Sequence, residues 1–214
     1  WASTLALTGN DSYFYPSVGL TAILSEMFDM PEAISFAKIR GSYANVGNEV
    51  PYNRIFPRHT INPDKSVSFN TTKPFTDAKP EIITTSEIGM DLRFFNNRLG
   101  LDLTIYNINS QDQFIEINQP FEDFTSFFVN AGEITNKGVE ITLSGKPIVT
   151  EDLTWSTALN YSKNTNEIVE LHPDTQEIGQ GGSEGIRVRL VEGGSISDLY
   201  AFKFLRDEQG RIIL

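Results

Sequence analysis

Strict alternation of apolar and polar side chains is the feature that most constrains the fold of this chain. In the run 139–143 every odd position is apolar and every even position is polar. After a short connection the run 153–161 repeats the pattern, with Leu153, Trp155, Leu159 and Tyr161 on odd positions. A period of two places successive side chains on opposite faces of a β-strand. We therefore predict a β-hairpin with one apolar face, which must meet either a protein core or lipid.

The same alternation recurs along the whole chain, whereas helical periodicity is nearly absent. The runs 12–27, 34–46, 82–94 and 98–107 each alternate, which predicts an all-β protein with about seven antiparallel strands. A soluble sandwich would alternate as well. Charged residues lie in the middle of the strands, on the polar face, which suits a water-filled lumen: Lys38, Arg40, Glu87, Asp91, Arg93, Asp102 and Glu140.

Composition limits the classes of protein that remain. The chain has 214 residues, is 39% hydrophobic, and lacks any run near the roughly 18 apolar residues of a membrane helix. Membrane strands stay open, because their alternating residues average out. The net charge of −11 argues against nucleic acid and against a peripheral anchor on anionic lipid. The chain contains no cysteine, so no disulfide framework or thiolate site is expected.

Short and long connections alternate between the expected strands. The short ones are 28–33, 94–99 and 145–152, and the long ones are 47–80, 111–129 and 166–185. We expect a tight turn at Asn96 and Asn97, since asparagine tolerates positive φ. An up-and-down membrane barrel has short periplasmic turns and long extracellular loops, whereas a sandwich has no reason to gather its long loops at one end.

Aromatic residues gather near the ends of the expected strands, as at Tyr13, Phe28, Phe94, Trp155 and Tyr161. Membrane interfaces favour such girdles, although aromatic residues also pack in sandwich cores. Lipid is the better interpretation of the apolar face, and the residues predicted to face lipid are Leu20, Ile39, Met90, Leu92, Leu101, Leu103, Ile141, Leu143 and Leu159. Arginine should then impair assembly at Leu103 or Ile141 and be tolerated at Thr104 or Thr142.

Six segments, in order, resemble the SusC/RagA family of TonB-dependent outer-membrane transporters. They are "SYFYPSVGLTAIL" (12–24), "AKIRGSYANVGN" (37–48), "TTSEIGMDLRFFNNRLGLDLTIYN" (84–107), "FVNAGEITNKGVEITLSGKPI" (128–148), "LTWSTALNYSKNTNEIVEL" (153–171) and "LYAFKFLRDEQGRI" (199–212). The resemblance implies a transmembrane β-barrel of about 22 strands whose lumen is plugged.

The resemblance also implies a function and partners. Such a barrel would lie in the outer membrane of a Gram-negative, Bacteroidetes-like bacterium and import glycans or peptides with a SusD-like surface lipoprotein, using energy delivered by TonB. The chain begins on one expected strand and stops on another, so we expect residues 1–214 to be part of a barrel domain. The plug, the TonB-interacting segment and the C-terminal strand are expected to lie elsewhere in a longer protein.

No residue pattern predicts catalysis, a metal or a cofactor. The two histidines, His59 and His172, have no metal-ligand spacing, and no Ser, His and Asp set has a recognisable arrangement. The glycine-rich run 179–185 lacks the Gly-Lys-Ser/Thr ending of a phosphate loop. We therefore expect a protein that is not an enzyme.

Binding is the more plausible role for the long loops. Aromatic and arginine side chains there suit sugars or peptides, and the candidate contacts are Tyr52, Arg54, Phe56, Arg58, Phe114, Phe121 and Phe124. Alternatively, the phenylalanines pack among themselves or against the lipoprotein. For the chain as a whole, the other hypothesis is a secreted β-sandwich that acts as a carbohydrate-binding or adhesin module, with domain boundaries near residues 1 and 214.

Overall fold

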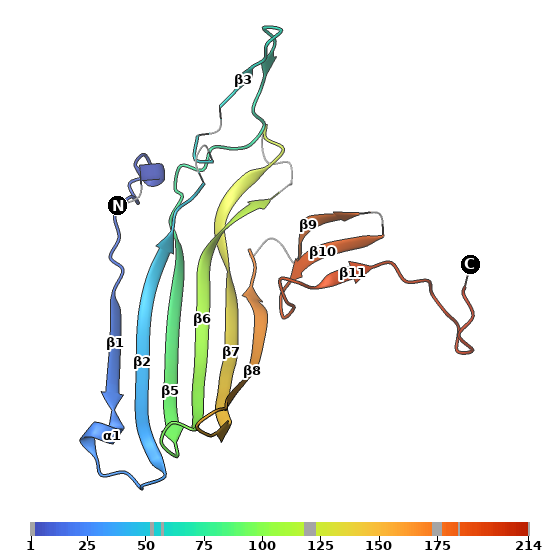
Figure 1. Ribbon diagram of the computed structural model, residues 1–214. Coiled ribbons are helices and arrows are strands. Elements are labelled where there is room, and N and C mark those ends of the chain that lie inside the picture. The colour runs from blue at the N-terminus through green and yellow to red at the C-terminus, as the bar shows by residue number, and fades with distance from the viewer. Residues whose placement is uncertain are drawn as a thin grey trace.

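A computed structural model describes residues 3–51, 54–56, 58–117, 123–172, 177–183 and 185–213. Its main feature is a six-stranded antiparallel sheet in the order β1-β2-β5-β6-β7-β8 (Figure 1). The elements of this sheet are β1 (Ser17–Ile23), β2 (Ile34–Asn48), β5 (Glu81–Phe94), β6 (Leu99–Ile117), β7 (Phe127–Val149) and β8 (Thr154–Glu170). Each strand pairs with the next wall strand in the chain, which is the up-and-down topology that the alternation predicted.

Short connections lie together at one end of this sheet (Figure 1). The short helix α1 (Leu24–Met27) leads from β1 towards β2. The β5–β6 turn contains Phe95, Asn96 and Asn97 at φ values of 53°, 55° and 62°, so the tight turn predicted from the two asparagines is confirmed. The β7–β8 turn is closed by the Thr150 N–H, which donates to the Leu153 carbonyl at 2.8 Å.

At the opposite end the strands run further than the sequence indicated. β6 continues to Ile117 and β7 starts at Phe127, so most of the loop expected at 111–129 is strand. The ladder passes Asp112 and Gly132, which have φ values of 53° and 85°, and resumes at the pair Gln113 and Ala131. Polar and apolar residues no longer alternate strictly here, as in the run Gln113, Phe114, Ile115 and Glu116, yet the backbone pairing continues.

The strand register sorts the side chains onto two faces. One cross-strand row joins Ala22, Ile39, Met90, Leu103, Ile141 and Tyr161, and the adjacent rows on the same side are also apolar. All nine residues predicted to face lipid lie on this side, which we call the apolar face; the opposite side is the charged face. Contact of the apolar face with lipid stays a prediction.

No second sheet packs across the apolar face in the part of the chain that the structure describes. Leu20, Ile88 and Leu159 there are 77%, 71% and 67% exposed. A β-sandwich would bury such residues between two sheets. The fold is therefore an open segment of an antiparallel β-barrel wall, as the sequence predicted. Among the described residues, no helix is long and apolar enough to cross a membrane.

Smaller elements cluster at the end with the long loops. They are the 3-10 turn η1 (Ser3–Leu5), the hairpin β3 (Thr60–Ile61) and β4 (Val67–Ser68), and a three-stranded sheet of β9 (Glu177–Ser183), β10 (Ile186–Val191) and β11 (Leu199–Ala201). The three-stranded sheet packs Ile178 and Leu190 against Ile168 and Leu171. In the late segment of the resemblance, 199–212, the short β11 pairs with β10, and Arg206 and Ile212 form an isolated antiparallel bridge.

Candidate functional site

An ion-pair network occupies the middle of the charged face. The Arg40 guanidinium lies 3.4 Å from Glu87 Oε1 and 3.4 Å from Asp102 Oδ2, and Arg40 Nη2 donates to Thr104 Oγ1 at 2.6 Å. These residues come from β2, β5 and β6, which neighbour one another in the sheet. Charge-assisted hydrogen bonds of this kind hold three wall strands in one register.

Glycines make room for the large side chains on this face. A Cβ atom at Gly89 would lie 2.5 Å from Arg40 Nε, so an alanine there would press on the guanidinium. The Tyr106 ring likewise covers Gly138, and its hydroxyl is 3.3 Å from Asn164 Oδ1. Sequence reasoning missed these positions, although a glycine inside a strand is a signal of close approach by a neighbouring group.

A second set of charges lies nearer the short turns. Asp91 is 3.6 Å from Lys38 Nζ and 3.4 Å from Arg93 Nη2, and the Arg93 guanidinium lies over the Phe36 ring at 4.8 Å. Together with the Arg40 network, these acids and bases neutralise one another. The charged face is thus a structured polar wall that suits contact with water.

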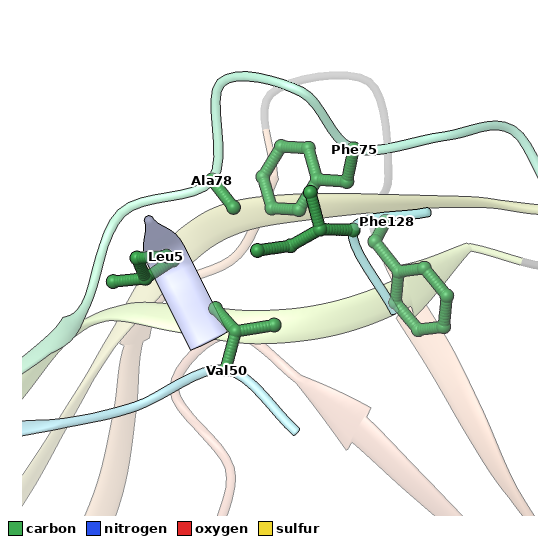
Figure 2. Packing of buried hydrophobic residues seen from close by; sticks show 6 residues of the cluster. Leu5, Val50, Phe75, Ala78 and Phe128 are labelled. Carbon is green, nitrogen blue, oxygen red and sulfur yellow. The ribbon is translucent and has the colours of Figure 1, made fainter. Parts of the chain in front are cut away.

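The long loops meet in a hydrophobic cluster above the sheet, which we call the loop cluster. Its buried residues are Leu5, Val50, Ile55, Phe75, Ala78 and Phe128 (Figure 2). Phe114 stacks on Phe128 with ring centroids 4.5 Å apart and an interplanar angle of 11°. The Arg54 guanidinium lies 5.2 Å from the centre of the Phe128 ring. Two predicted contact residues, Arg54 and Phe114, are therefore brought together around Phe128.

Two others, Phe56 and Arg58, line a hollow of about 340 Å³ beside the loop cluster, together with Leu7 and Pro51. Phe56 is 43% exposed and Arg58 is exposed, so both side chains are accessible to a ligand. Phe124 is half-buried and is not among the residues that line this hollow. Tyr52 and Phe121 lie outside the described residues. Substrate contact by any of the seven stays a prediction.

Polar side chains that the sequence did not single out fasten the loops to the sheet. Asn130 on β7 accepts a hydrogen bond from the Lys79 N–H at 2.7 Å and donates to the Lys79 and Asp112 carbonyls, each at 2.9 Å. Glu81 accepts from the Phe114 N–H at 2.8 Å. Such bonds depend on residues far apart in sequence, so no local pattern could reveal them.

His59 has ordinary structural surroundings. His59 Nδ1 accepts a hydrogen bond from the Asn70 N–H at 2.9 Å, and its ring meets the Phe69 ring edge-on at 5.2 Å. Within the described ranges, no group of three or more His, Cys, Asp or Glu side chains could hold a metal ion. Near the loop cluster, burial and the neighbouring Glu49 carboxylate raise the pKa of Tyr13.

Comparison with known proteins gives consistent results. A family model described as "TonB dependent receptor-like, beta-barrel" matches residues 2–190. TonB-dependent receptor P3 of Formosa agariphila is 28% identical over 217 residues, which cover 94% of this chain and 22% of that protein. TonB-dependent receptor P39 of the same organism is 30% identical over 202 residues, with 89% and 18% covered. TonB-dependent receptor SusC of Bacteroides thetaiotaomicron is 26% identical over 189 residues, with 79% and 18% covered.

Solved structures show the same fold. The RagAB peptide importer in its "open-open" state matches with a TM-score of 0.75 at 23% identity, over 90% of this chain and 21% of that one. Its "closed-closed" state matches with a TM-score of 0.74 at 22% identity, over 89% and 22%. The chain thus spans about a fifth of the length of the proteins that it resembles.

Proposed function

We propose that this chain, which belongs to the TonB-dependent receptor-like β-barrel family, forms part of the wall of an outer-membrane transporter that imports nutrients. In this proposal the apolar face meets hydrocarbon and the charged face lines the lumen. The long loops face the cell exterior and the short turns face the periplasm, as in other membrane barrels.

The observation that carries the proposal is the uncovered apolar face. Water-soluble monomers rarely expose a large contiguous apolar surface, and here such a surface spans six strands. Hydrocarbon would solvate these side chains, and the paired charges on the other side of the same strands would remain in water. The sandwich hypothesis lacks support, because it requires a second sheet over this face.

The nutrient and the partners belong to the proposal as well. The family resemblance implies a glycan or a peptide as the cargo, and the matched structures are of a peptide importer named RagAB, so we propose one of these two classes. A SusD-like lipoprotein would cover the loop end, and TonB would act through another part of the full-length protein. The hollow beside Phe56 and Arg58 is the candidate contact with cargo or lipoprotein.

Heat-modifiable gel mobility tests the membrane role. Folded membrane barrels resist detergent unless boiled, so the full-length protein should appear in outer-membrane fractions and change its mobility on boiling. A full-length protein that is soluble in the periplasm or the medium would refute the proposal.

Uptake measurements test the contact hypothesis. The Phe56→Ala/Arg58→Ala variant should assemble normally but import labelled oligosaccharide or oligopeptide more slowly than wild type. The matched control is Ile61→Ala/Lys65→Ala in the β3–β4 hairpin, which changes similarly exposed residues away from the hollow. Equal uptake by the two variants would exclude the hollow from the transport path.

A further inference from the structure

The apolar face changes its character abruptly on the side of the long loops. Its last apolar row consists of Leu20, Gly41, Ile88, Ile105 and Val139, opposite Lys163 on β8. The next row on the same face contains Val18, Tyr43, Ser86, Asn107, Lys137 and Thr165. Rows on one face are two residues apart, about 7 Å along the strands. If the wall spans a membrane, hydrocarbon gives way to lipid headgroups at this level.

Two lysines stand at this boundary. Lys137 pairs with Thr165 across β7 and β8, and Lys163 pairs with Val139. The two lysines are therefore diagonal neighbours on the apolar face, with Cα atoms about 7–8 Å apart. In the described part of the chain, the side-chain ammonium group of neither lysine forms an ion pair or a hydrogen bond. The nearest acid on this face is Glu167, one row further towards the loops.

The lack of a partner is notable in a chain with a net charge of −11. Acids outnumber bases, and Lys38 and Arg40 on the charged face do have carboxylate partners. The alternating strand geometry directs Glu140 away from both lysines, to the charged face. Two ammonium groups in adjacent rows thus lack a salt-bridge partner among the described residues.

A hollow of about 850 Å³ spans the two rows that contain these lysines, and both lysines line it together with Ser86 and Asn107. Its apolar lining includes Ile88, Ile105 and Val139, and Gly41 leaves it wider because no side chain occupies that position. A Cβ atom at Gly41 would meet no atom closer than the Glu87 carbonyl oxygen at 3.8 Å. The result is a partly apolar trough that runs across the strands, with two positive charges at its β7–β8 end.

We propose that this trough binds one phosphorylated anionic lipid of the loop-side leaflet, with the phosphate held by Lys137 and Lys163 and an acyl chain packed against Ile88 and Ile105. This inference rests on the proposed membrane role. Lysine ammonium groups are strong donors to phosphate oxygens, and long lysine side chains extend from an apolar surface towards a charged interface. The trough matches such a lipid in two ways, because its lysines suit an anionic group and its apolar lining suits a hydrocarbon chain.

Native mass spectrometry of the full-length protein tests the proposal. The protein is incubated with mixed micelles that contain equal amounts of phosphatidylglycerol and phosphatidylcholine, and the retained lipids are counted. Wild type should retain phosphatidylglycerol preferentially. Each of Lys137→Gln and Lys163→Gln should reduce that preference about five-fold, and the double variant should reduce it about 25-fold.

Lys65→Gln/Lys79→Gln is the matched control, since it removes the same charge from exposed positions in the loops. It should leave the preference unchanged. A double variant that keeps the wild-type preference would overturn the proposal, and so would displacement of phosphatidylglycerol by excess inorganic phosphate, because that would show that the acyl chain contributes nothing. The single variants serve the same purpose if the double variant fails to assemble.

Heat-modifiable mobility separates this inference from the proposed function. Wild type, control and lysine variants should all reach the outer membrane. If none does, the membrane role fails. If all assemble and the lipid preference does not depend on the lysines, only the lipid site fails.

Discussion

Replacing Ile141 by arginine should strongly impair assembly of the full-length protein. Ile141 pairs with Leu103 and Tyr161 in the apolar row that also contains Ile39 and Met90. Ile141 lies four positions before Gly145, which is near the short turns, and four positions after Lys137, which is at the polar boundary. At about 3.4 Å per residue, both margins are about 14 Å away along the strand. Ile141 therefore lies near the middle of the apolar band.

The expected cost follows from this depth. Arginine near the midplane of a membrane barrel costs about 2–4 kcal/mol. That cost lowers the folding equilibrium constant by about 30- to 700-fold, at 1.4 kcal/mol for each factor of ten. Equilibrium unfolding in urea, with the protein in phospholipid vesicles, measures this difference directly.

Thr142→Arg is the matched control. Thr142 is the next residue on β7, lies on the charged face, and pairs with Asp102 and Asn160. An arginine there would lose the exposed hydrogen bond that Thr142 Oγ1 donates to Asn160 Oδ1 at 2.9 Å, but it would meet a carboxylate in water. The free energy of unfolding should therefore change by less than about 1.5 kcal/mol, which is below the cost expected at Ile141. Equal losses in the two variants, or a larger loss at Thr142, would refute the assignment of the faces. Thr104 is unsuitable as a control, because it is buried and accepts a hydrogen bond from Arg40.

Three further predictions concern packing and charge. Gly89→Ala should destabilise the full-length protein by about 1–3 kcal/mol, since the new methyl group would press on Arg40, whereas Gly41→Ala should cost almost nothing. The free energy of unfolding of both variants in vesicles measures this difference, and equal effects would contradict the packing described. Phe128→Ala should destabilise the loop cluster by about 3–5 kcal/mol and accelerate proteolysis of residues 50–78, whereas Phe56→Ala should leave the cleavage rate unchanged. Similar cleavage rates in the two variants would contradict the role of the cluster in holding the loops. Hydrogen bonds from the Ser66 hydroxyl and backbone N–H lower the pKa of Asp64. Their contribution to the stability of the hairpin is therefore complete above the ordinary pKa of an aspartate and is lost as the pH falls through the lowered value. NMR titration of the Asp64 carboxyl group should show a higher midpoint in Ser66→Ala, and an unchanged midpoint would exclude the hydroxyl as the cause.

The sequence predicted the wall well because alternation is a local signal that the sheet must obey. The faces of Ile39, Met90 and Leu103 follow from counting odd and even positions, once one strand is assigned. The turn at Asn96 and Asn97 was also predictable, because its positive φ values require particular residues.

The ends of the strands were less predictable. β6 and β7 extend into a region assigned to loops, because backbone pairing continues where the side chains no longer show a clean apolar pattern. The candidate site, too, could be predicted only in part. Local composition pointed to Phe114 and Arg54, but only the fold brings them to Phe128, and the ties made by Asn130 join residues about 50 positions apart.

The outer edge of β8 has a consequence for how such a wall grows. Near its loop end the Ile168 N–H donates to the Gly194 carbonyl and the Gly193 N–H donates to the Ile168 carbonyl, each at 2.8 Å. Asn166 adds a bond from the Ile196 N–H at 2.9 Å. These bonds come from a turn rather than from a strand, and they occupy the edge of β8 near its loop end. A strand that extends the wall beyond β8 would therefore have to pair with β8 nearer the short turns or displace this turn.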